Sequence, residues 1–199
     1  MSELVLPIGH LHGSGPGGAL VRVGPEQVEL DDTRFAVWSL AHGLPDRASA
    51  EPWTPQALLA TAAAQGLGDL QATLDDLVAD RLVRLVDPGA GVRFAEQHRL
   101  VPLVLGLGND PAAVTTWSLG LLGQPLVQVT GTTLDLFQHA DLDTDLWNAV
   151  RNVARVARES GYTDPAATDP ERVLADVLGT LHVLLSTNAV CLDTRYVLA

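Results

Sequence analysis

The sequence contains no lysine, a single cysteine and no long run of apolar residues. Cys191 has no partner for a disulfide within the chain, and no cysteine and histidine cluster has the spacing of a structural zinc site. No stretch approaches the ~18 apolar residues of a membrane helix, and the N-terminus lacks the basic and apolar regions of a signal peptide. The sequence therefore predicts a cytoplasmic protein that is held together by its hydrophobic core, with no metal and no cofactor.

Positive charge is also scarce. The 12 basic residues are all arginine, and against 24 acidic residues they leave a formal charge of −12 and a pI near 4.6. Such a charge repels nucleic-acid phosphates at long range, whereas DNA-binding domains usually carry a basic face. Arginine without lysine, beside abundant alanine, glycine, leucine and valine, indicates the codon usage of a GC-rich bacterial genome.

Motifs that would indicate catalysis or a cofactor are weak. Gly13, Gly15 and Gly18 have the spacing of a dinucleotide-binding loop, but the pattern that follows is a strand, and a nucleotide site there needs a helix. His10 and His12 would share one face of a strand and supply half a metal site, which no other residue completes. We therefore predict a protein without enzymatic activity, and keep an enzyme with an unrecognised site as the second alternative.

The first half of the chain has the element order of a winged helix. Residues 4–11 are typical of a strand that ends in a glycine-rich loop, and residues 20–30 of a hairpin around Gly24 and Pro25. Helices are expected over 32–43, 55–66 and 69–82, because capping residues open them and glycines close the first two. Two apolar runs joined by the turn residues 87–91 then predict a hairpin wing.

The second half repeats this pattern in part. LVRV (20–23) matches LVQV (126–129), residues 73–87 match 173–187, and Trp38 matches Trp147. A duplication explains these matches, and the alternative is that any two leucine-rich helix and strand segments align this well. In this half we expect helices over 141–161 and from 170, and terminal strands over 188–193 and 195–199.

The predicted fold is therefore α+β, with two winged-helix-like units that each combine a three-helix core with a small antiparallel hairpin wing. The boundaries are 1–98 for the first unit and 99–199 for the second. Small units of this kind often associate, so a homodimer is one expected assembly.

Candidate binding residues come from three segments. Val21, Arg22 and Val23 lie in the hairpin, whose edge is a place for strand addition. Arg81 and Arg84 follow the third helix, which in DNA-binding winged helices enters the major groove, but four aspartates on that helix oppose phosphate binding. The last set consists of Arg151, Arg155 and Arg158, which have helical spacing and would form one stripe. This stripe is a solvated helix face, a docking face for an acidic helix or peptide, or a DNA contact.

Residues 19–87 resemble the PqqD-like peptide-recognition domains of peptide-modifying pathways. The resemblance is carried by VELDDTRFAVWSLAHG, TPQALLATAAAQG and ATLDDLVADRLVRLVD. It implies that a leader-like peptide adds to a strand edge beside a helix. In length and charge the chain also looks like the acidic tandem winged-helix adaptors of chromosome-organising complexes. We therefore predict an adaptor that binds a protein or peptide, with a DNA-binding transcriptional regulator as the first alternative.

Overall fold

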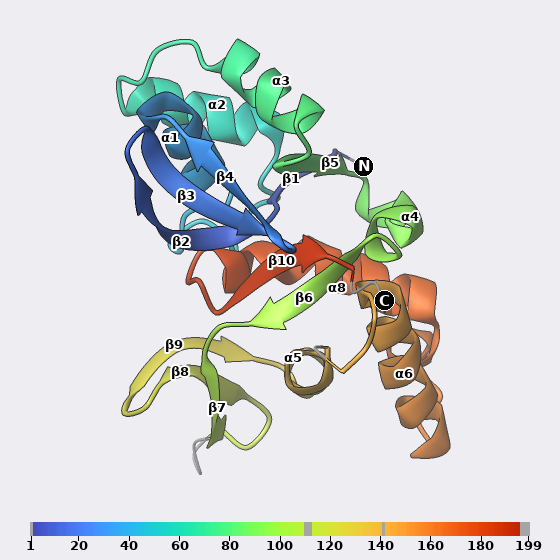
Figure 1. The fold of residues 1–199 in the computed structure, drawn as a ribbon. Coiled ribbons are helices and arrows are strands. Elements are labelled where there is room, and N and C mark those ends of the chain that lie inside the picture. The colour runs from blue at the N-terminus through green and yellow to red at the C-terminus, as the bar shows by residue number, and fades with distance from the viewer. Residues whose placement is uncertain (1, 110–112, 141, 196–199) are drawn as a thin grey trace.

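The computed structural model describes residues 2–109, 113–140 and 142–195. It is a mixed structure of helices and small antiparallel sheets, so the predicted α+β class is confirmed. In Figure 1 the first half of the chain, blue to green, lies above the second half, which is yellow to red.

The first half begins with a strand, continues as a three-stranded meander and ends with helices and a further strand. Its elements are β1 (Leu4–Pro7), β2 (His10–Gly15), β3 (Gly18–Val23), β4 (Glu26–Leu30), α1 (Asp32–Leu40), α2 (Pro55–Ala64), α3 (Gln71–Ala79) and β5 (Val83–Val86). The meander has the order β2-β3-β4, and β5 pairs antiparallel with β1. The predicted hairpin and all three predicted helices are confirmed, with Asp31 and Thr54 as side-chain caps of α1 and α2.

Two local predictions for this half are wrong. The glycine-rich stretch is not an open loop, because residues 10–15 form β2 against β3. Position 18 requires glycine, since its φ is 145° and a Cβ there would lie 2.0 Å from the Leu30 oxygen. Residues 83–97 do not form a wing hairpin either. After β5 the chain turns into η1 (Pro88–Ala90) and α4 (Val92–Ala95), because Asp87 and Pro88 together open a helical turn.

The second half has the same general plan. Its elements are β6 (His98–Pro102), β7 (Leu105–Asn109), β8 (Trp117–Leu121), β9 (Gln124–Val129), α5 (Gly131–His139), α6 (Leu146–Glu159), α7 (Pro165–Thr168), α8 (Pro170–Leu185) and β10 (Val190–Thr194). The meander is β7-β8-β9, and β10 pairs antiparallel with β6. The predicted helix over 141–161 is shorter, since its cap is Asp145, and residues 196–199 of the predicted last strand lie outside the described residues.

Equivalent hydrogen bonds connect the ends of both halves. Ile8 N donates to Leu82 O, and Leu103 N donates to Ala189 O, both at 2.9 Å. Arg81 after α3 and Asn188 after α8 have positive φ angles of 63° and 52°. The two halves therefore share an element order in which the first and last strands pair.

This shared order corrects the matches made from sequence. LVRV lies in the middle strand β3 and LVQV in the outer strand β9, so these segments are not equivalent. Trp147 is on α6 and is not the counterpart of Trp38. Trp38 follows the N-cap of α1 by the same number of residues as Phe137 follows the N-cap of α5, so Phe137 is the equivalent residue. Residues 183 and 185 belong to α8 and not to a strand, so the match of 73–87 with 173–187 has the wrong register as well.

The two halves are joined through β1. Val5 belongs to the core of the first half, whereas Leu4, Leu6 and Ile8 pack into the core of the second half. His182 of α8 donates its Nε2 proton to Val5 O at 2.8 Å, and Gly9 N donates to Leu192 O at 2.6 Å. A strand from the start of the chain therefore belongs to both cores.

Acid is predicted to weaken this junction through His182. Burial lowers the pKa of His182 from 6.5 to about 4, so the folded chain keeps the ring neutral while the unfolded chain takes up a proton below pH 6.5. The free energy of unfolding should therefore fall by roughly 2 to 3 kcal/mol between pH 7.5 and 4.5 through this residue. Burial also lowers the pKa of His42 and His98, which adds to the fall. Denaturant titrations of wild type and His182→Gln check this, since an equal fall in both would contradict it.

Asp193 supplies a second test of the junction. Its carboxylate accepts from Gly24 N at 2.6 Å and from Arg99 at 3.1 Å, and the residue is 7% exposed. Asp193→Ala removes both bonds, together with a bond from Thr194 N at 2.9 Å, and should lower the free energy of unfolding by about 2 to 3 kcal/mol, whereas Asp193→Asn keeps an acceptor and should lose less. Equal losses in urea titrations of the two variants would show that the carboxylate oxygens contribute nothing specific.

Candidate functional site

The outer edge of β4 is not paired by any described strand. The sheet order places β4 at the end of the meander, and its register with β3 continues without interruption from Val23–Glu26 to Ala19–Leu30. In a two-residue hairpin the two residues that close the turn, here Val23 and Glu26, exchange backbone hydrogen bonds. Along the strands, hydrogen-bonded and non-hydrogen-bonded pairs then alternate. The backbone N–H and C=O groups of Gln27 and Glu29 therefore face away from β3 and are available to another strand.

The outer edges of β2 and β9 are less suited to strand addition. The start of β2 lies against β10, where Gly9 N bonds to Leu192 O. In the second meander β9 contains Pro125 and a register shift opposite Leu119 and Gly120. Prolines and bulges are features that protect edge strands from pairing. Among these three strands, β4 is the one whose edge is regular and free.

Three partly buried apolar side chains lie around the core of the first half. Val28 of β4, Val78 of α3 and Leu85 of β5 each pack on the core of the first half and keep part of their surface accessible. An ion pair between Arg34 and Asp80 connects the first turn of α1, just after β4, to the end of α3. The end of the free strand thus lies close to the end of α3.

The charge around β4 is negative. Glu26 and Glu29 are exposed on the strand, and Asp31 and Asp32 follow at the start of α1. Glu29 accepts a hydrogen bond from Gly17 N at 2.6 Å, which holds one of these carboxylates beside the β2–β3 turn. A ligand on this edge would meet carboxylates and half-buried apolar residues.

The hairpin residues predicted from sequence lie one strand away from this edge. Val21 is fully buried in β3, and Val23 is half-buried. Arg22 is exposed and donates from Nε to Gly24 O at 3.0 Å. Since β3 is paired on both sides, its backbone has no free edge, and the residues that sequence reasoning missed are Gln27 and Glu29.

Arg81 and Arg84 do not join the other predicted residues. Arg81 is exposed after α3, and Arg84 lies in β5 opposite Leu6, where it lines a small hollow with Arg93 and Asp87. Arg81 and Arg84 therefore form no common surface with Val21, Arg22 and Val23 of the β3–β4 hairpin.

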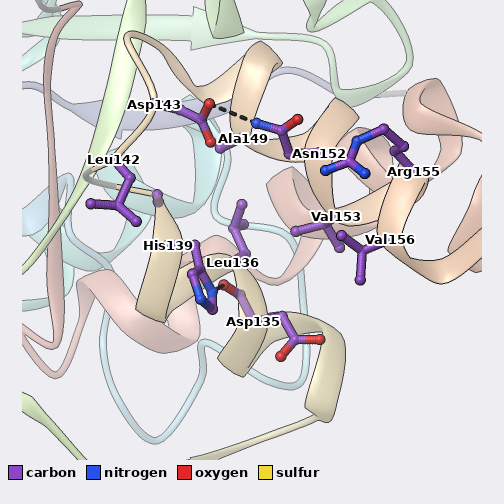
Figure 2. A pocket seen from close by; sticks show the side chains of 11 residues that line it. Asp135, Leu136, His139, Leu142, Asp143, Ala149, Asn152, Val153, Arg155 and Val156 are labelled. Carbon is purple, nitrogen blue, oxygen red and sulfur yellow. Dashed lines mark hydrogen bonds between the residues drawn. The ribbon is translucent and has the colours of Figure 1, made fainter. Parts of the chain in front are cut away.

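A groove lies between α5 and α6 (Figure 2). It has a volume of about 500 Å³. Its apolar lining comes from both helices and from the segment that joins them, and both polar and apolar side chains form the rim. The lining residues are Asp135, Leu136, His139, Ala140, Leu142, Asp143, Ala149, Asn152, Val153, Arg155 and Val156.

The three arginines of the predicted stripe do come together on α6. Arg151, Arg155 and Arg158 line a hollow of about 240 Å³ beside Asn148 and Asn152. Arg155 pairs with Glu159 at 2.7 Å, and Arg158 donates to Thr168 O. Arg151 has no ion-pair or hydrogen-bond partner within the described residues.

A cavity of about 480 Å³ lies where the two halves meet. Phe35 and Trp38 line it together with His10, His42 and Cys191. His42 donates from Nδ1 to Trp38 O at 3.1 Å, and burial raises the pKa of the Cys191 thiol to about 12. A thiol with such a pKa is protonated at neutral pH and is a poor nucleophile.

Neither a metal cluster nor a membrane helix is present in the part of the chain that the structure describes. No group of three or more histidine, cysteine, aspartate or glutamate residues there could hold an ion, and the rings of His10 and His12 are 6.4 Å apart. No helix there has the length and apolar character to cross a bilayer. Comparisons with protein-family models, curated proteins and solved structures found no match to this chain.

The accessibility of Cys191 tests the junction cavity. The residue is 2% exposed, and its raised pKa keeps the thiolate rare, so a disulfide reagent should modify the folded chain about a hundredfold more slowly than the unfolded chain. Absorbance of the released thiolate measures both rates at pH 8. A fast, stoichiometric reaction under native conditions would mean that this cavity opens readily.

Proposed function

We propose that the protein is a non-enzymatic adaptor that binds an extended peptide segment of another protein by strand addition to β4. The single observation that carries this proposal is the regular, proline-free and unpaired edge of β4. Main-chain hydrogen bonds to such an edge give affinity, and pockets for alternate side chains give selectivity.

The surroundings of β4 favour a particular kind of peptide. Apolar side chains on one face of the added strand would contact the accessible parts of Val28 and Val78. Carboxylates at Glu26, Glu29 and Asp32 favour arginine or lysine in the peptide, and the charge of −12 attracts basic segments at a distance. The proposed ligand is therefore a basic segment with alternating apolar residues.

The PqqD-like resemblance of residues 19–87 supports the same mode of binding. The resembling segment spans β3 and β4, the three helices and β5. In the family, a leader-like peptide adds to a strand edge beside a helix, which agrees with an edge at β4 whose end lies near α3. We also propose that the two halves are winged-helix-like units related by duplication, of which the second has lost a usable edge through Pro125.

DNA binding is the second candidate because three arginines gather on α6. Each of them would have to reach a phosphate, yet Glu159 pairs with Arg155, and the neighbouring α5–α6 groove has Asp135 and Asp143 on its rim. These carboxylates would repel phosphates, so we place regulation through DNA behind peptide binding.

Selection from a displayed library of random linear peptides tests the proposal on the full chain. We expect enriched peptides to be basic with alternating apolar residues. Gln27→Pro removes an outward-facing amide of β4 and should weaken their binding at least tenfold, about 1.4 kcal/mol. Gln128→Pro, at an exposed position of the outer strand β9, is the matched control and should leave affinity unchanged.

Fluorescence anisotropy with the selected peptides measures these affinities, and circular dichroism confirms that both variants fold. Peptides that bind wild type and Gln27→Pro equally would contradict strand addition at β4. Salt-dependent binding of a DNA duplex that exceeds the affinity for every peptide would favour the regulator instead.

A further inference from the structure

The α5–α6 groove exposes apolar side chains at its rim, on both sides of its opening. Leu142, on the segment between the helices, is 78% exposed, and Val156 of α6 is 49% exposed. Figure 2 shows Leu136 and Val153 deeper in the same groove, with His139 of α5 facing the valines of α6. Two exposed large apolar residues beside an apolar groove mark a place where another surface can be buried.

The α6 side of the groove carries concentrated positive charge. Leu146, Val150 and Ala154 bury one face of α6, while Arg151, Arg155 and Arg158 occupy another face at helical spacing. Asn152 and Arg155 line both the apolar groove and the arginine hollow, so the two surfaces are continuous. In a chain with a charge of −12 this is a local reversal of sign.

From this combination we infer that the α5–α6 groove docks an amphipathic acidic helix of a partner protein. The apolar face of that helix would pack against Leu142, Val153 and Val156, and its carboxylates would pair with Arg151, Arg155 and Arg158. This surface belongs to the second half of the chain and does not rest on strand addition at β4. The adaptor would then hold two different protein segments, a basic strand and an acidic helix.

Arg151 and Arg155 are available for such a partner, while Arg158 also donates to Thr168 O. Arg151 has no partner among the described residues, and the Arg155–Glu159 pair is an exposed i,i+4 pair, with side chains 52% and 62% exposed. Exposed ion pairs of this kind contribute little to the free energy of folding. Arg155 can therefore exchange Glu159 for a carboxylate of the partner at little cost in free energy. An arginine accepts a carboxylate in bidentate geometry, which adds direction to the charge attraction.

The rim distinguishes an acidic helix from a nucleic acid. Asp135 lies on α5, across the groove from the arginines of α6, and Asp143 accepts a hydrogen bond at 2.8 Å from Asn152, which lines both the groove and the arginine hollow. A helix can present carboxylates to α6 and apolar or basic residues to the other side. A phosphate backbone carries charge along its whole length, so it would meet these aspartates.

Two synthetic peptides of about 18 residues test this inference with the full chain. The first places leucines on one helical face and glutamates on the other, and the second replaces every glutamate by lysine. Fluorescence anisotropy measures affinity, and amide NMR shifts of the labelled protein locate the binding surface. We expect the acidic peptide to bind in the micromolar range, to shift residues of α5 and α6, and to weaken as salt rises, whereas the basic peptide should leave these helices unchanged.

Substitutions make the test specific. Arg151→Glu with Arg155→Glu, and separately Val156→Asp, should each weaken the acidic peptide at least tenfold. Arg172→Glu, an exposed arginine on α8 whose nearest carboxylate lies 3.9 Å away, is the matched charge control and should change affinity by less than twofold. Gln27→Pro should leave this binding intact, which separates it from the peptide edge at β4.

Several results would overturn the inference. They are failure of the acidic peptide to bind at millimolar concentration, equal binding of both peptides at this groove, and equal effects of the α6 substitutions and of Arg172→Glu. A DNA duplex that binds more tightly than the acidic peptide and is lost with the arginines would assign the surface to nucleic acid. A dimer of the free chain that dissociates with Val156→Asp would assign it to a second copy.

Discussion

Strand β1 joins the two halves of the molecule, because its alternate side chains enter two different cores. Val5 packs with the helices of the first half, while Leu4, Leu6 and Ile8 pack with those of the second. The bond from His182 to Val5 O and the bonds to β10 from Gly9, just before β2, and from Gly24, in the β3–β4 turn, then fix the orientation of the two meanders. The free edge of β4 and the α5–α6 groove are consequently positioned on one body.

The two meanders share an order of elements but differ in their edges. The first keeps a regular outer strand, flanked by carboxylates, whereas the second has a proline and a bulge in the equivalent strand. In the second half the accessible apolar surface lies instead between α5 and α6, beside arginines. A repeated plan has thus produced two surfaces of opposite charge, which suits a protein that joins two partners.

Local signals in the sequence predicted what depends on near neighbours. Asp31, Thr54 and Asp169 opened helices as caps, Gly24 and Pro25 closed a hairpin, and the spacing of Arg151, Arg155 and Arg158 placed them on one helix face. Pairings between distant segments were missed. The partner of β5 is β1, near the start of the chain, and α5 was missed because Leu134 and Leu136 resemble an alternating strand. The α5–α6 groove was missed for the same reason, because α5 forms one of its walls. The free edge at β4 was missed because the hydrophobic pattern of three strands does not determine their order in the sheet.

The central claim is that β4 receives another strand, and hydrogen exchange at its backbone measures this most directly. With a selected basic peptide bound, the amide protons of Gln27 and Glu29 should exchange at least tenfold more slowly, because they gain hydrogen-bond acceptors, while Gln128 in β9 stays unchanged. Unchanged exchange at Gln27 and Glu29 in the saturated complex would contradict strand addition and the function proposed from it.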